Sequence, residues 1–174
     1  MGQRLKLAAR IMEEISISEA KESDWQSIWN IIEPVFRSGE TYAFSPDISA
    51  AEGHRVWMEV PTATYIAKGN NSVLGTYFIK PNQPALGSHV CNCGYIVGEK
   101  ARGKGVASLM CQHSQHEAKR LGFWAMQFNL VVSTNKVAVI LWQKLGFEIV
   151  GTLSGAFRHS KYGLVDAFIM YKKL

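Results

Sequence analysis

Glycine and basic residues alternate in the segment Arg102-Gly103-Lys104-Gly105, directly before an apolar pattern with helical spacing. A helix N-terminus leaves several N–H groups unpaired and carries the positive end of the helix dipole. Glycines let these groups close around an anion without interference from side chains, and the Arg and Lys side chains add positive charge. The segment therefore predicts a phosphate site, for which a pyrophosphate is the natural occupant.

Two other glycine-rich loops fit this segment less well. The P-loop requires Gly-Lys followed by Ser or Thr, whereas Gly103-Lys104 is followed by glycine. The dinucleotide fingerprint ends on Gly or Ala, where this chain has Ser108, and the strand before the loop belongs to an antiparallel meander. A basic turn whose glycines serve backbone geometry alone remains an alternative.

The periodicity of apolar residues predicts the elements that must hold this loop. A period of two predicts strands at 15–18, 62–68, 72–80, 88–97, 124–132, 148–153 and 166–172, and helical spacing predicts helices at 24–39, 49–60, 104–121 and 135–145. Ser23 and Asp24 are expected to cap the first helix and Ser49 the second, with Gly39 ending the first. This order predicts one α/β domain over residues 11–174 with a mixed sheet, after a flexible arm of residues 1–10.

Composition excludes several classes of protein. The chain has 174 residues, of which 47% are hydrophobic and 19% charged, so it is not a disordered chain. No apolar run reaches the ~20 residues of a membrane span, and the N-terminus lacks the features of a signal peptide. Three cysteines without framework spacing favour a reducing, cytoplasmic compartment. No metal site is predicted, because Cys91 and Cys93 lack further ligands and His113 and His116 fit a helix surface.

Charge is divided unequally along the chain. Residues 1–60 hold six Lys and Arg against ten Asp and Glu, a net of −4, and residues 61–174 hold thirteen against four, a net of +9. A basic majority suggests an anionic partner: nucleic acid, an acidic membrane or a phosphorylated ligand. No nucleic-acid module or basic-aromatic run is present, so a phosphorylated ligand is favoured.

A second motif follows the basic loop: Asn135-x-x-Ala138-x-x-Leu141-Trp142-x-x-x-Gly146-Phe147. The spacing Arg102-x-x-Gly105-x-Ala107 also fits the pattern (Arg or Gln)-x-x-Gly-x-(Gly or Ala). Together the two motifs resemble the acyl-CoA site of the GNAT superfamily of N-acyltransferases, and the predicted element order is similar to that family along residues 14–174.

This resemblance implies a fold and a ligand. The fold would be a mixed, mostly antiparallel sheet flanked by helices and splayed at the strands around the acyl-CoA site. The cosubstrate would be acetyl-CoA, and a homodimer is a further expectation. By the same resemblance, the cofactor-binding residues would be Tyr95, Ile96, Val97, Arg102, Gly103, Lys104, Gly105, Val106, Ala107, Asn135 and Trp142.

Two residues that many members of the family use in catalysis are missing. The strand before the loop carries no carboxylate, and Trp142, which has no titratable proton, stands where those members place a tyrosine. A thiol with a pKa of ~8.5 can leave as thiolate near neutral pH, so direct attack by the amine remains feasible. Tyr162, His159 and Asp166 are further candidates for a base, although each has a structural interpretation.

Asn92 and Asn129 are unusual because asparagine is unfavourable inside a strand, which suggests a polar task. Asn135 is also a natural N-cap. The local pattern around these three residues is similar to N-acetyltransferases that detoxify proline analogues such as L-azetidine-2-carboxylate. That resemblance implies that Asn92 and Asn129 hold the substrate and that Asn135 aids catalysis or positions the cofactor.

The segment from Ala156 to Asp166 is expected to be a loop near the acceptor, where Arg158 could pair with a substrate carboxylate. The first two helices, with Phe36, Tyr42, Phe44 and Trp57, are expected to wall the same pocket.

The resulting hypothesis is an N-acetyltransferase acting on a small amine or amino acid, which the resemblance narrows to proline-like compounds. The alternatives are acetylation of a protein N-terminus or lysine, and a non-catalytic acyl-CoA-binding regulator. Nucleic acid and membrane partners are not expected.

Overall fold

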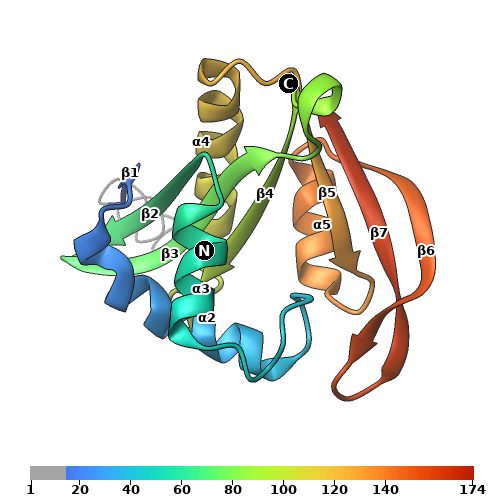
Figure 1. Cartoon of the computed structure of the whole chain (residues 1–174), viewed down its shortest axis with the longest axis horizontal. Coiled ribbons are helices and arrows are strands. Elements are labelled where there is room, and N and C mark those ends of the chain that lie inside the picture. The colour runs from blue at the N-terminus through green and yellow to red at the C-terminus, as the bar shows by residue number, and fades with distance from the viewer. Residues whose placement is uncertain (1–14) are drawn as a thin grey trace, which may run out of the picture.

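A computed structural model describes residues 15–174 and contains one seven-stranded sheet in the order β1-β2-β3-β4-β5-β7-β6 (Figure 1). The strands are β1 Ser16–Glu19, β2 Ala63–Gly69, β3 Ser72–Pro81, β4 Val90–Val97, β5 Ala125–Val132, β6 Glu148–His159 and β7 Gly163–Lys173. Every neighbouring pair is antiparallel except β4 and β5. The expected mixed, mostly antiparallel sheet is therefore confirmed. The predicted arm at 1–10 and residues 11–14 of the predicted domain lie outside the described residues.

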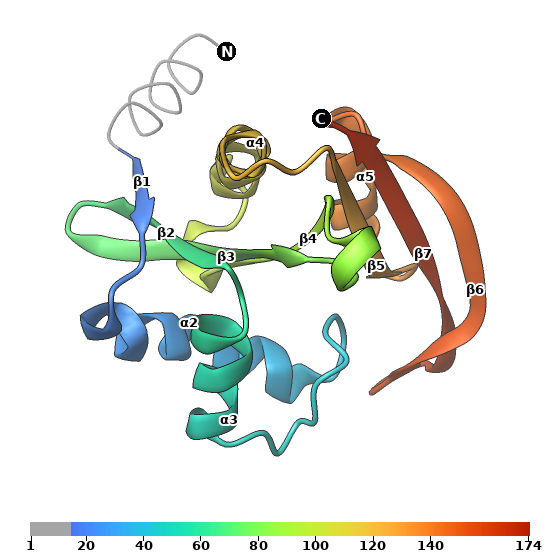
Figure 2. The ribbon, with the colours of Figure 1, turned by 45° about the horizontal axis from the view of Figure 1, so that its top comes forward.

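The helices cover both faces of this sheet, as Figure 2 shows. They are α2 Trp25–Ser38, α3 Ala50–His54, α4 Val106–Arg120 and α5 Lys136–Lys144, and a π-helical turn at Arg55–Glu59 continues α3. α2 and α3 lie on one face, and α4 and α5 lie on the other. No helix in the described part of the chain is long and apolar enough to cross a membrane.

Burial on both faces produces two apolar cores. One, between the sheet and α2 and α3, contains Ile28, Ile32, Phe36, Trp57, Ile66, Phe78 and Ile96. The other, on the α4 and α5 side, contains Tyr77, Ile79, Met110, Met126, Phe128, Trp142 and Met170. Strand β3 contributes side chains to both cores, because successive side chains of a strand point to opposite faces.

Local signals place most helix ends as predicted. Gly39 ends α2 with a φ of 62°, and the Ser49 hydroxyl accepts the Glu52 N–H at 3.1 Å at the start of α3. Asp24 occupies the N-cap position of α2, as predicted, but its side chain makes no capping hydrogen bond to the helix. Its carboxylate instead accepts the Lys21 backbone N–H and pairs with Lys68, both at 2.9 Å.

The prediction of a loop between Ala156 and Asp166 is wrong. β6 continues to His159 and β7 begins at Gly163, so the segment forms a hairpin whose turn is only three residues long. Burial alternates with a period of two in this segment, because Phe157 and His159 are buried and Arg158 between them is exposed. Polar residues at the exposed positions make this alternation resemble a loop.

The pairing of β4 with β5 is short, and this determines where the site lies. Only Val90 with Ala125 and Cys91 with Met126 are paired, after which the strands diverge. On the other side of β5 the ladder with β7 is also irregular between Phe128 and Val131. Strands β4 and β5 are therefore splayed, as the family resemblance implied.

Candidate active site

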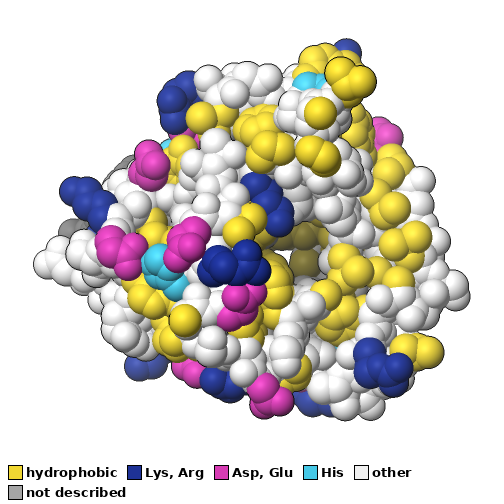
Figure 3. Space-filling model, in the orientation of Figure 1, with side chains coloured by type: hydrophobic (Ala, Val, Ile, Leu, Met, Phe, Trp, Pro, Cys, Tyr) yellow, Lys and Arg dark blue, Asp and Glu magenta, His cyan; other side chains and the backbone are white. Residues whose placement is uncertain are grey.

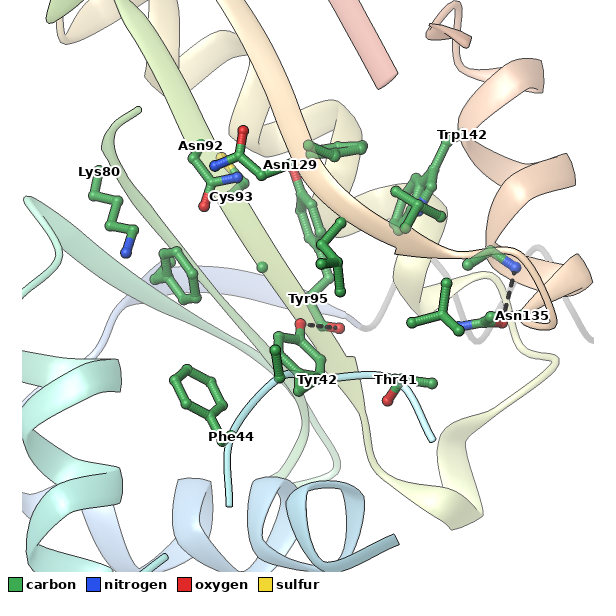
Figure 4. Close-up of a pocket in the computed structure, with 18 residues that line it drawn as sticks. Thr41, Tyr42, Phe44, Lys80, Asn92, Cys93, Tyr95, Asn129, Asn135 and Trp142 are labelled. Atoms are coloured by element: carbon green, nitrogen blue, oxygen red, sulfur yellow. Dashed lines mark hydrogen bonds between the residues drawn. The ribbon is translucent and has the colours of Figure 1, made fainter. Parts of the chain in front are cut away.

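A pocket of about 310 Å³ opens where β4 and β5 diverge. Its walls come from β3, β4, β5, α5 and residues 41–44 after α2 (Figure 4). The lining residues include Thr41, Tyr42, Phe44, Phe78, Lys80, Asn92, Cys93, Tyr95, Phe128, Asn129, Asn135 and Trp142. Figure 3 shows a central hollow, lined by apolar side chains and with basic side chains beside it.

Asn92 crosses the gap between the two strands. Its side-chain Nδ2 donates a hydrogen bond of 2.9 Å to the backbone carbonyl of Gln127 on β5. Asn129 lies one pleat further along β5, is exposed, and accepts a 2.9 Å hydrogen bond from the Gln127 side chain. The fold brings together these two asparagines, which the sequence singled out, and both line the same pocket.

Asn135 and Trp142 form the α5 side of the pocket. The Asn135 side chain caps α5 by accepting the Ala138 N–H at 3.2 Å. Trp142 is buried, and its ring centroid lies 5.0 Å from that of Tyr95 and 5.3 Å from that of Phe128. Trp142 is therefore both a core residue and a pocket wall.

Tyr95 presents its backbone rather than its hydroxyl to the pocket region. The Tyr95 hydroxyl lies 2.7 Å from Ser114 Oγ, on the α4 side of the sheet. Its carbonyl oxygen accepts a 3.0 Å hydrogen bond from the Tyr42 hydroxyl, seen in Figure 4. Burial raises the pKa of both Tyr42 and Tyr95, so both hydroxyls keep their protons at neutral pH.

Thr41, beside Tyr42, brings an unsatisfied polar atom to this wall. Its Oγ1 is buried and has no hydrogen-bond partner in the described part of the chain. A buried hydroxyl without a partner costs about 1–3 kcal/mol, so the group is suited to a polar ligand atom.

The predicted phosphate loop lies at the N-terminus of α4 but does not line this pocket, and neither do Ile96 and Val97. Gly103 and Gly105 both have positive φ, 73° and 82°, which other residues rarely adopt. Gly105 is the N-cap of α4 and supplies no side-chain cap. The first amides of α4 are therefore not satisfied by a capping side chain, as an anion site requires.

The expectation for the acceptor side needs two corrections. Tyr42 and Phe44 line the pocket, but Phe36 and Trp57 are fully buried behind them. Arg158 is exposed on the β6–β7 hairpin and does not line the pocket. Lys80, a residue that the sequence analysis did not single out, does line it.

The late-chain candidates for a base also lie elsewhere. His159 is buried, and its Nδ1 accepts the Lys161 N–H at 3.0 Å, while Asp166 accepts the Gly155 N–H at 2.9 Å. Neither residue lines the pocket, and neither does the exposed Tyr162. Cys93 does, but burial raises the pKa of its thiol well above the ordinary value. The described lining residues therefore supply no carboxylate and no thiol that ionises easily at neutral pH.

Comparison with known proteins agrees with this geometry. The sequence profile described as "Acetyltransferase (GNAT) family" matches residues 25–147. The N-acetyltransferase aca1 of Schizosaccharomyces pombe is 38% identical over 108 residues, which cover 62% of this chain. The match covers 52% of aca1, so the chain spans about half the length of that curated relative.

Solved structures have the same fold. A GCN5-related N-acetyltransferase from Kribbella flavida superposes with a TM-score of 0.89 at 38% identity, covering 94% of this chain and 99% of that one. A phosphinothricin acetyltransferase from Sinorhizobium meliloti, in complex with AcCoA, has a TM-score of 0.81 at 19% identity, covering 92% and 89%. The second match supports the fold alone.

Proposed function

This chain belongs to the GNAT family of acetyltransferases, and on that premise we propose that it transfers the acetyl group of acetyl-CoA to the amine of a small molecule or amino acid. The observation that carries the proposal is the divergence of β4 from β5 after Cys91 and Met126, with a pocket at the point of divergence.

The splay gives the pantetheine arm of acetyl-CoA a place to bind. Backbone groups of a strand that has lost its neighbour need other hydrogen-bond partners, and an extended amide-containing chain can supply them. We assign this contact to the β4 backbone at Tyr95, Ile96 and Val97, with Trp142 as an apolar wall. The unpartnered Oγ1 of Thr41 is a further group that a bound ligand could satisfy.

The phosphates are assigned to the segment from Arg102 to Ala107. The left-handed conformations of Gly103 and Gly105 leave the backbone accessible, and no side chain caps the N-terminus of α4. A pyrophosphate would gain hydrogen bonds from the amides there and favourable charge from Arg102 and Lys104.

The chemistry proposed is direct acyl transfer. Acetyl-CoA supplies an activated acetyl group, and the new C–N bond forms as the C–S bond breaks and CoA leaves as thiolate. The pocket's part is to hold the acceptor nitrogen in position, a contribution that can exceed that of acid–base catalysis. Asn92 and Asn129 are proposed to hold the acceptor and Asn135 to position the reacting groups, while the amine loses its proton to water.

The size and lining of the pocket favour a small acceptor. At about 310 Å³ it lies at the lower end of the range for small-molecule sites. The aromatic residues Tyr42, Phe44 and Phe78 line the same pocket as its polar asparagines, which suits a compact ring bearing polar groups. The proline-like acceptors indicated by the local sequence resemblance meet this requirement.

The acceptor class can be tested by mass spectrometry of products. Acetyl-CoA and the protein are incubated with L-azetidine-2-carboxylate, L-proline, primary amines, and peptides with free N-termini or lysines. Acetylation of the small amines supports the proposal. Acetylation of peptides alone would instead identify a protein acetyltransferase, and tight acetyl-CoA binding without any product would identify a regulator.

A further inference from the structure

Lys80 is the one residue with a charged side chain among the described residues that line the pocket. It lies on β3, in register with Asn92 on β4. Residues directly opposite on antiparallel strands have Cβ atoms about 4.5–5.5 Å apart on the same face. Lys80 and Asn92 are therefore neighbours at one end of the pocket, with Asn129 beside them and Trp142 at the far side (Figure 4).

The Lys80 ammonium has no acidic partner within the described chain: each ion pair found there involves other residues. Its contact is with an aromatic ring, since Nζ lies 5.5 Å from the centroid of Phe78. Phe78 also lines the pocket, so this cation–π contact places the ammonium of the half-buried Lys80 at the pocket wall. A cation placed in this way attracts an incoming anion without competition from a carboxylate of its own.

The charge that the described side chains bring to the pocket is therefore positive alone. The described lining residues include Lys80 and no Asp or Glu. A small acceptor whose only charge is an ammonium would meet a like charge with nothing to offset it. An acceptor that also carries a carboxylate would gain an ion pair in an environment less polar than water.

We propose that Lys80 determines acceptor specificity by pairing with the carboxylate of an amino or imino acid, an inference that rests on the proposed function. Asn92 can share this task, because an amide nitrogen has two N–H donors and one is used on Gln127. The carboxylate, held at the Lys80 end, would then direct the amine toward the part of the pocket nearer Trp142.

The test compares matched acceptors that differ in the carboxylate alone. Values of kcat/KM are measured for L-proline and L-prolinamide, and for L-azetidine-2-carboxylate and its carboxamide, with wild type, Lys80→Met and Lys80→Arg. Lys80→Met keeps the apolar stem and removes the charge, whereas Lys80→Arg keeps the charge. Arg158→Met removes the same charge from the hairpin outside the pocket and serves as the matched control.

The wild type is expected to prefer the acids. Lys80→Met should lower kcat/KM for the acids about 10- to 100-fold, the range for loss of a charge-assisted hydrogen bond, and leave the amides within about threefold. Lys80→Arg should retain most of the preference, and Arg158→Met all of it. An unchanged acid-to-amide ratio in Lys80→Met, with the small amines still acetylated, would overturn the role of Lys80 and leave the proposed function intact.

A binding measurement keeps the two ideas separable if no acceptor is acetylated. L-proline and L-prolinamide are then titrated by calorimetry into wild-type protein saturated with CoA, and into Lys80→Met. Binding of proline that Lys80→Met loses would support the carboxylate site while the proposed reaction fails. Equal binding of proline by both proteins, or none by wild type, would overturn the Lys80 inference as well.

Discussion

The side-chain amide of Asn92 donates a 2.9 Å hydrogen bond to the backbone carbonyl of Gln127, one residue beyond the last paired residues of β4 and β5. This bond spans the point where the strands begin to separate. A side-chain hydrogen bond thus links the two strands where their backbone pairing stops, and the residue that makes it also lines the pocket.

Replacing Asn92 is predicted to affect the acceptor more than the cosubstrate. Asn92→Ala should raise KM for the acceptor about tenfold, since about 1–1.5 kcal/mol is lost with one hydrogen bond, while Kd for acetyl-CoA stays within about twofold. Asn129→Ala should act in the same direction, and Asn30→Ala, on the exposed side of α2, should change neither value. Loss of acetyl-CoA binding in Asn92→Ala would instead argue against an acceptor role.

Two glycines allow the phosphate loop to be tested against a matched control. Gly103 and Gly122 both have positive φ, 73° and 86°, and a Cβ on either would meet no atom within 4 Å. Alanine at each should therefore cost a similar ~1–2 kcal/mol of stability from backbone strain. Only Gly103→Ala should also raise Kd for acetyl-CoA, by about tenfold. Calorimetric titration of both variants checks this, and equal effects on Kd would exclude the loop as the phosphate site.

The elements and the loop were predictable because their signals are local. Gly39 ends a helix and Asn135 caps one for reasons contained within a few residues. The spacing of Arg102, Gly105 and Ala107 likewise depends on a single turn. Each of these predictions required no knowledge of what packs against the segment.

Lys80 could not be identified in this way. A lysine near the end of a strand has the pattern of a solvated edge residue, and its place in the pocket depends on residues 41–44, more than thirty positions earlier. The strands at 148–153 and 166–172 were predicted, but the outer part of the β6–β7 hairpin was missed because polar residues such as Arg158, Ser160 and Lys161 are exposed there. Arg158 was therefore assigned to a loop near the acceptor, whereas it lies on the hairpin and does not line the pocket.

Cys93 lines the pocket, but burial raises the pKa of its thiol well above the ordinary value, so it is not a nucleophile at neutral pH. Initial-rate kinetics should therefore follow a sequential pattern, with both substrates bound before any product leaves. Cys93→Ala is expected to keep kcat within about threefold, since no covalent step uses it. Ping-pong kinetics, or an acetylated cysteine in the intact protein after incubation with acetyl-CoA alone, would contradict direct transfer.

The contacts of His54, which does not line the pocket, predict that part of the protein's stability depends on pH. Its Nδ1 lies 2.7 Å from Glu59 and its Nε2 3.0 Å from Glu22. Partial burial acts to lower the pKa of His54, but the two carboxylates outweigh it and the net pKa is raised. The stabilisation is therefore complete below the unfolded-state pKa of about 6.5 and is lost as pH rises through the higher folded-state pKa.

His54→Gln should accordingly lower Tm by about 2–4 °C near pH 5.5 and by less near pH 8.5. Thermal unfolding of wild type and variant at the two pH values measures this difference. A difference in Tm that grows with pH would show that His54 is not held in its charged form by these glutamates.

We propose that the protein uses acetyl-CoA bound at the β4–β5 splay to acetylate a small amine held in the pocket. The most direct test of this proposal is the rate of free CoA thiol release from acetyl-CoA, with and without L-azetidine-2-carboxylate or L-proline. Release of CoA is expected to depend on the acceptor, to saturate with acceptor concentration, and to yield one CoA for each acetylated product. Acetyl-CoA binding without any release that depends on these acceptors would contradict the proposal.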